Sequence, residues 1–113
     1  MAKTDKVPLE RHVTAQCTRF LESLKRGGRE IWWVKLHGGS MQRAGLPDLL
    51  VLLDGKLFAI ELKRPGGAPT RLQIATLTAM ARAGATAAVV DNVETFKALL
   101  VPSEESVTWC ATH

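Results

Sequence analysis

Apolar residues near the N-terminus recur at steps of three and four positions, which is the period of an amphipathic helix. The Gly27-Gly28 pair that follows them is a typical helix stop. We therefore predict that the first element is a helix with one buried face. Its apolar stripe consists of Leu9, Val13, Cys17, Phe20, Leu21 and Leu24.

Four shorter apolar runs predict β-strands, over residues 31–36, 49–53, 57–62 and 86–90. The second and third runs flank Asp54-Gly55, and such a dipeptide between hydrophobic runs is the strongest short-range signal for a hairpin with a type I′ turn. Both hairpin strands are apolar on both faces, so we expect a sheet that is covered on both sides. We expect the last strand to be buried as well.

A second helix is predicted to begin near residue 70. Thr70 and Gln73 have the spacing of a capping box, which marks a helix start. Leu77 and Met80 continue the inner face of this helix, and Gly84 ends it.

A short third helix is expected over residues 93–100, with Asp91 or Asn92 as its cap and Pro102 after its end. The resulting order is helix, three strands, helix, strand, helix. This order predicts a single domain, residues 1–113, of the α/β class, in which helices flank a mixed four-stranded sheet.

Charged side chains are expected to gather at one end of the hairpin. A two-residue turn fixes the register, and the register places Asp48 directly opposite Glu61 on one face. Opposed residues have Cβ atoms about 5 Å apart, and like charges there are destabilising, so a cation is expected beside them. Lys63 follows Glu61 by two positions, and the alternation of a strand sends it to the same face.

The sequence Pro47-Asp48, followed by Glu61-Leu62-Lys63, resembles the PD-(D/E)xK nuclease signature. The wider pattern, over residues 9–100, is similar to the VRR-NUC family of that superfamily. This resemblance implies a restriction-endonuclease-like α/β fold with an αβββαβ core, and a nuclease activity. The residues that carry it are 45–50 (GLPDLL), 59–63 (AIELK), Gln73 and Val89-Val90.

Hydrolysis of a phosphodiester requires an activated water and neutralisation of the phosphate charge, both of which a hard divalent cation supplies. Mg²⁺ prefers oxygen ligands, and Asp48 and Glu61 offer two carboxylates. The resemblance implies the backbone carbonyl of Leu62 as the third protein ligand, with Mg²⁺ or Mn²⁺ as cofactor. We assign Lys63 to the attacking water or to the developing charge, and favour these roles over that of general base.

Four further residues are candidates for the site. The family carries an acid in its first helix, and the matching Glu10 could bind a metal directly or through water. The same resemblance places Gln73 beside the site. Both residues also have structural explanations, Glu10 as a first-turn acid favoured by the helix dipole and Gln73 as a capping residue. Lys35 and Arg43, the latter in the glycine-rich loop 37–45, are candidate DNA phosphate contacts by charge and position alone.

The 113 residues carry 15 Lys and Arg against 11 Asp and Glu, a net charge of +4 that suits a polyanionic partner. Cys17 and Cys110 make neither a CxxC motif nor a disulfide framework, and His12, His37 and His113 share no ligand spacing. No apolar segment approaches the about 20 residues that cross a bilayer, and the N-terminus lacks the apolar stretch of a signal peptide. We therefore expect a cytoplasmic protein, with no membrane partner.

The leading hypothesis is a Mg²⁺- or Mn²⁺-dependent endonuclease that acts on DNA. By resemblance to stand-alone VRR-NUC proteins of phages and bacteria, we expect a homodimer that cuts branched DNA such as Holliday junctions. Val107 and Trp109 of the tail are candidate interface residues. Two alternatives stay open: a nucleic-acid-binding module that keeps the fold but does not cut, and a sequence-specific restriction endonuclease, for whose recognition elements 113 residues leave little room.

Overall fold

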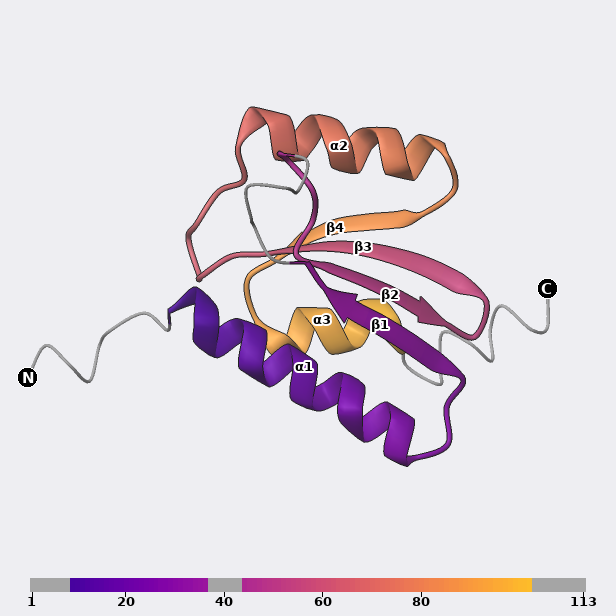
Figure 1. Ribbon diagram of the computed structural model, residues 1–113. Coiled ribbons are helices and arrows are strands. Elements are labelled where there is room, and N and C mark those ends of the chain that lie inside the picture. The colour runs from indigo at the N-terminus through magenta and orange to yellow at the C-terminus, as the bar shows by residue number, and fades with distance from the viewer. Residues whose placement is uncertain (1–8, 37–43, 103–113) are drawn as a thin grey trace, which may run out of the picture.

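The computed structural model of the chain describes residues 9–36 and 44–102, which form three helices and four strands (Figure 1). Their order is the predicted one, and only the ends of the first and third strands differ, each by one residue. The glycine-rich stretch 37–43 and the tail 103–113, with the interface candidates Val107 and Trp109, lie outside the described residues. The elements are α1 (Glu10–Arg26), β1 (Ile31–Lys35), β2 (Leu49–Leu53), β3 (Lys56–Leu62), α2 (Arg71–Arg82), β4 (Thr86–Val90) and α3 (Val93–Leu100).

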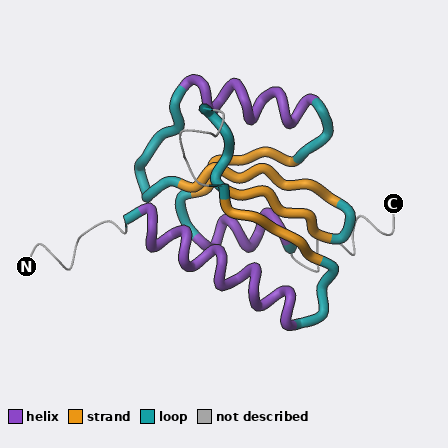
Figure 2. Tube along the Cα trace, viewed as in Figure 1, coloured by secondary structure: helices purple, strands orange, loops and turns teal. Residues whose placement is uncertain are grey.

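The four strands form one mixed sheet in the order β1-β2-β3-β4 (Figure 2). The first three strands are antiparallel to their neighbours, and β4 runs parallel to β3. Asp54 and Gly55 have φ values of 52° and 85°, as the two central residues of a type I′ turn require. The turn sets Leu53 opposite Lys56 and Leu49 opposite Ile60, which confirms the predicted register and the α/β fold class.

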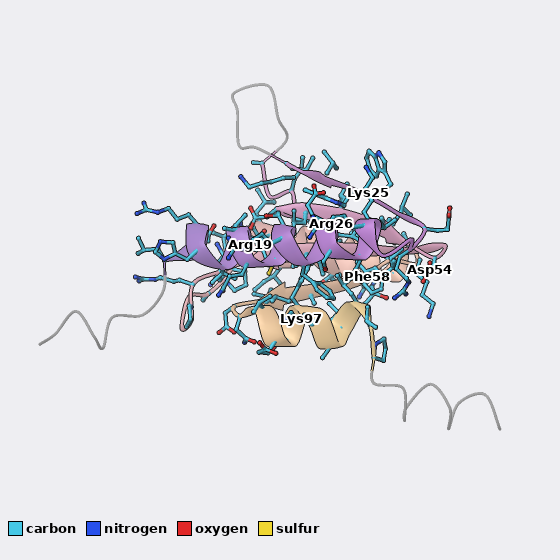
Figure 3. All side chains as sticks on the ribbon, turned by 90° about the horizontal axis from the view of Figure 1, so that it is seen from below. Arg19, Lys25, Arg26, Asp54, Phe58 and Lys97 are labelled. Carbon is cyan, nitrogen blue, oxygen red and sulfur yellow. The ribbon has the colours of Figure 1, made fainter. Side chains whose placement is uncertain are left out.

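Helices α1 and α3 cover one face of the sheet and enclose the hydrophobic core (Figure 1). The two helices pack side by side, as the view onto this face shows (Figure 3). There the Phe20 and Phe96 rings meet edge to face with centroids 6.2 Å apart, and the Lys97 ammonium lies 5.6 Å from the Phe20 centroid. Cys17 is fully buried in this core, and burial raises the pKa of its thiol to about 12, which fits a packing role.

Helix α2 lies on the opposite face, where it packs against β4 and β3 (Figure 1). The side chains of Trp32 and Leu52, which are paired across β1 and β2, remain 58% and 43% exposed on that face. The expectation that the sheet is covered on both sides is therefore confirmed only in part: helices lie on both faces, but β1 and β2 stay open on the face of α2. The expectation that 86–90 is a buried strand is wrong, because β4 is an edge strand with Val89 39% exposed. Trp32 and Leu52 are exposed because α2 connects β3 to β4 and packs only against these two strands, so no helix covers β1 and β2 on this face.

The helix starts follow the predicted capping chemistry. Thr70 and Gln73 form a complete capping box at the start of α2. At α3 the cap is Asn92, whose side chain accepts a hydrogen bond of 2.8 Å from the Thr95 amide, so the choice between Asp91 and Asn92 is settled.

The helices within residues 9–36 and 44–102 are all too short or too polar to span a membrane.

The turn before β2 is packed directly against α2. Gly45 adopts a φ of 86°, a conformation that side chains rarely permit. A Cβ atom at this position would lie 2.6 Å from Cγ of Leu72. Glycine therefore allows the backbone to approach α2 closely. Pro47, two residues before β2, is fully buried.

Candidate active site

Asp48 is held in place by the strands on both sides of it. It directly precedes β2, and its backbone carbonyl accepts a hydrogen bond of 2.8 Å from the Leu36 amide that follows β1. Its side-chain Oδ2 accepts a second bond of 2.8 Å from the amide of Leu62 in β3. This second bond was not foreseen from the sequence. It fixes the carboxylate of Asp48 against the segment that carries Glu61 and Lys63.

Glu61 is the only buried charged residue in the described part of the chain, with 1% of its surface exposed. Its Oε2 accepts a hydrogen bond of 2.7 Å from Nε2 of Gln73 and lies 3.2 Å from Nζ of Lys63. Its Oε1 is buried and has no hydrogen-bond partner among the residues that the structure describes. Burial raises the pKa of Glu61, the charges of Asp48 and Glu10 raise it further, and Lys63 opposes this shift.

Lys63 is the cation that the charge pattern predicted beside the two acids. Its side chain is 17% exposed, and it contacts the carboxylate of Glu61 as described above. The Lys63 amide donates a hydrogen bond of 2.9 Å to the carbonyl of Val90, which continues the pairing of β3 with β4 beyond the last strand residue. The backbone on which Lys63 stands is therefore fixed by its neighbour strand.

Gln73 makes hydrogen bonds both to the helix cap and to Glu61. Its Oε1 accepts a hydrogen bond of 2.8 Å from the Thr70 amide and so completes the capping box of α2. Its Nε2 is then directed at Glu61. The structure thus places Gln73 beside Glu61, while its part in a reaction stays a prediction.

A pocket of about 520 Å³ lies between α1 and the end of β1, and Asp48 forms part of its wall. Glu10 and Lys35 line the same pocket as Asp48, while their roles in the site stay predictions. Arg43 lies outside the described residues. A pocket of about 610 Å³ near the hairpin turn, lined by Gly55, Lys56 and Gly84 among others, contains none of the predicted site residues.

The oxygen atoms at this end of the hairpin suit a hard divalent cation, because such ions prefer carboxylate and carbonyl ligands. A buried, unpaired carboxylate oxygen such as Glu61 Oε1 is the kind of group that a bound ion satisfies. Among residues 9–36 and 44–102, no group of three or more His, Cys, Asp and Glu side chains could hold one metal ion. Glu10, which is exposed at the start of α1, is therefore not clustered with Asp48 and Glu61 as a direct ligand.

Arg11 lines the same pocket and was not predicted from the sequence. A signal for it was available. Arg11, Thr14, Ala15 and Thr18 follow the spacing of a second helical stripe, beside the apolar stripe of α1, and all four line the pocket.

No protein-family model and no curated protein sequence matches the chain. The order of elements and the mixed four-stranded sheet flanked by helices are those of an α/β domain with a restriction-endonuclease-like fold. A solved structure described as a VRR_NUC domain aligns with it at a TM-score of 0.65 and 25% sequence identity, over 83% of this chain and 97% of that chain. This match supports the resemblance of the chain to the VRR-NUC family.

Proposed function

We propose that this chain is a divalent-metal-dependent endonuclease that hydrolyses phosphodiester bonds in DNA. The observation that carries the proposal is the buried Oε1 of Glu61, which has no hydrogen-bond partner in the described part of the chain. Leaving a buried carboxylate oxygen unpaired is costly, and a cation between Glu61 and Asp48 removes that cost. The likeness to a VRR_NUC domain supports a nuclease rather than another use of such an ion.

Mg²⁺ or Mn²⁺ would be held by the carboxylates of Asp48 and Glu61 and by the backbone carbonyl of Leu62. Once bound, the cation supplies charge neutralisation at the phosphate and a water of lowered pKa. The protein orients these ligands in advance. The Leu62 amide fixes Asp48, and Gln73 fixes Glu61 while leaving its second oxygen free.

Lys63 is assigned to the attacking water and to the negative charge that develops on the phosphate. Its half-buried ammonium is already held beside Glu61, so little reorganisation is needed when the charge forms. Glu10 lines the adjoining pocket and is assigned to a contact through water. Lys35 in the same pocket, and Arg43, are assigned to phosphates of the DNA.

The substrate is proposed to be branched DNA, cut by a homodimer. One site cuts one strand per engagement, and a two-fold axis would present paired sites to the two equivalent strands of a four-way junction. The exposed pair Trp32 and Leu52 supports self-association, because it forms an apolar surface on the sheet face that α2 leaves open. Light scattering of the purified chain tests this, and a monomer at assay concentrations would refute the homodimer.

The test of the activity is incubation with Mg²⁺ or Mn²⁺ and a panel of labelled substrates: linear duplex, flap, fork, four-way junction and single strand. We expect cleavage that depends on the metal, is strongest on the junction, and is lost in Asp48→Asn and Glu61→Gln. Both variants keep the size of the side chain and remove the charge. Binding without cleavage by the wild-type chain would instead identify a non-cutting module, and cleavage confined to one sequence would identify a restriction-type enzyme.

A further inference from the structure

A groove leads away from the proposed metal site between α1 and the end of β1. It is the pocket of about 520 Å³ that includes Asp48, and its opposite wall is the helical stripe Arg11, Thr14, Ala15 and Thr18. Lys35 belongs to the wall on the sheet side, because it pairs with the buried Leu49 and so stands on the face that α1 covers. The groove is thus open to solvent and joined directly to one of the two proposed metal ligands.

The charges in the groove come from two acids and two bases. Glu10 and Asp48 carry the negative charges, and Arg11 and Lys35, both exposed, carry the positive charges. The hydroxyls of Thr14 and Thr18 donate to backbone carbonyls of α1, at 3.0 Å to Glu10 and 3.0 Å to Thr14 respectively. The hydroxyl protons of Thr14 and Thr18 are therefore already donated within the helix. Arg11 and Lys35 are the strong hydrogen-bond donors that remain available to an anion in this groove.

We propose that this groove binds the DNA strand that is cut, with Arg11 and Lys35 each holding a backbone phosphate next to the scissile one. This inference rests on the proposed function, since it gives the path of the substrate through the same site. A guanidinium and an ammonium on opposite walls would grip a sugar-phosphate backbone without reading its sequence. The small side chain of Ala15 leaves space on the helix wall for that backbone.

A divalent cation should strengthen binding in this groove. Without it, the carboxylates of Glu10 and Asp48 oppose a phosphate in the same pocket. With the cation bound at Asp48 and Glu61, the net charge at this end of the groove becomes favourable to a polyanion. The affinity for DNA should therefore be higher with Ca²⁺, which takes the same oxygen ligands, than with EDTA.

The test compares the DNA affinity of charge-neutral variants by fluorescence anisotropy, with the four-way junction as probe and Ca²⁺ present. Arg11→Gln and Lys35→Gln are each expected to weaken binding by about five- to tenfold and to reduce the salt slope by about one phosphate contact. The matched controls are Arg82→Gln at the end of α2 and Lys56→Gln at the hairpin turn, which remove the same charge from exposed positions outside the groove. They are expected to bind within about twofold of the wild type.

A second pair of variants tests the space in the groove without any change of charge. Ala15→Trp places a large side chain in it, and Ala98→Trp places the same side chain on the exposed surface of α3. We expect Ala15→Trp to weaken DNA binding and raise KM, and Ala98→Trp to do neither. Thermal denaturation of all variants shows whether each is folded.

The outcomes separate this inference from the proposed function. If the wild-type chain neither binds nor cuts any DNA of the panel, the proposed function fails. If the wild type binds and cuts, but Arg11→Gln, Lys35→Gln and Ala15→Trp match their controls, the groove is not the path of the substrate and the nuclease assignment stands.

Discussion

The side chain of Gln73 joins the start of α2 to the buried carboxylate of Glu61. One end of its amide accepts the Thr70 amide at 2.8 Å, and the other end donates to Glu61 at 2.7 Å. Because an amide group is planar, the orientation that completes the helix cap also directs the donor at the acid. The position of α2 and the geometry of the proposed metal site are therefore coupled through one residue.

Gln73→Glu should separate these two roles. A glutamate keeps the Thr-x-x-Glu capping box but loses the donor and places a second carboxylate against Glu61. We expect this variant to lose nearly all cleavage and about 1–3 kcal/mol of unfolding free energy in the metal-free state. A cleavage assay measures the loss of activity, and urea denaturation in EDTA measures the loss of unfolding free energy.

The control for this variant is Thr70→Ala, which removes the cap but not the contact with Glu61. It should cost about 1 kcal/mol of unfolding free energy and leave cleavage close to that of the wild type. Equal activity of Gln73→Glu and Thr70→Ala would show that the contact between Gln73 and Glu61 has no part in the reaction.

Gly45→Ala should destabilise the protein more than Gly55→Ala. Both glycines have φ near 85°, so both substitutions carry a backbone cost of about 1 kcal/mol. Only at Gly45 would the new Cβ also meet Leu72, at 2.6 Å, whereas nothing lies within 4 Å of it at Gly55. We expect an additional loss of about 1–3 kcal/mol for Gly45→Ala, measured by chemical denaturation. Equal losses for the two variants would mean that α2 yields to the extra methyl group at no cost.

The hairpin and its three charged residues could be predicted because they depend on local rules. The Asp54-Gly55 turn determines the register, and the register determines which residues share a face. The capping box of α2 is local in the same sense. These rules are sufficient to place Glu61 and Lys63 together, as the structure confirms at 3.2 Å.

The features that were missed depend on how distant elements pack. Alternation along β1 sends Trp32 and Trp33 to opposite faces, but only the packing of α2 decides that Trp32 remains 58% exposed. The hydrogen bond from the Leu62 amide to Asp48 depends on the side-chain conformation of Asp48, which lies just before β2 and outside its regular pairing with β3. The helical spacing of Arg11 with Thr14 and Thr18 is visible in the sequence, but only the packing of α1 across the end of β1 places this stripe in the groove.

The stability of the metal-free protein should fall with rising pH because of Glu61. Its pKa is raised in the folded state, by burial first and then by Asp48, so the folded chain retains this proton to higher pH than the unfolded chain. The stabilisation is fully present below the unfolded pKa and is lost as the pH rises through the folded pKa. Glu61→Gln should remove this loss. We therefore expect the difference in unfolding free energy between Glu61→Gln and the wild type to grow, in EDTA, from the ordinary glutamate pKa upward. A difference that does not change with pH would contradict the raised pKa.

Lys63 should affect turnover more than DNA affinity. Its ammonium is held beside Glu61, and its assigned contact is with charge that develops only in the transition state. Lys63→Ala is therefore expected to lower kcat by about 100-fold or more, while the DNA dissociation constant in Ca²⁺ changes much less. Lys63→Arg should restore only part of the rate, because a planar guanidinium does not reproduce the position of a compact ammonium. Single-turnover cleavage and anisotropy titrations separate the two effects. A defect of Lys63→Ala that lies wholly in DNA affinity would instead make Lys63 a phosphate contact like those proposed for Arg11 and Lys35.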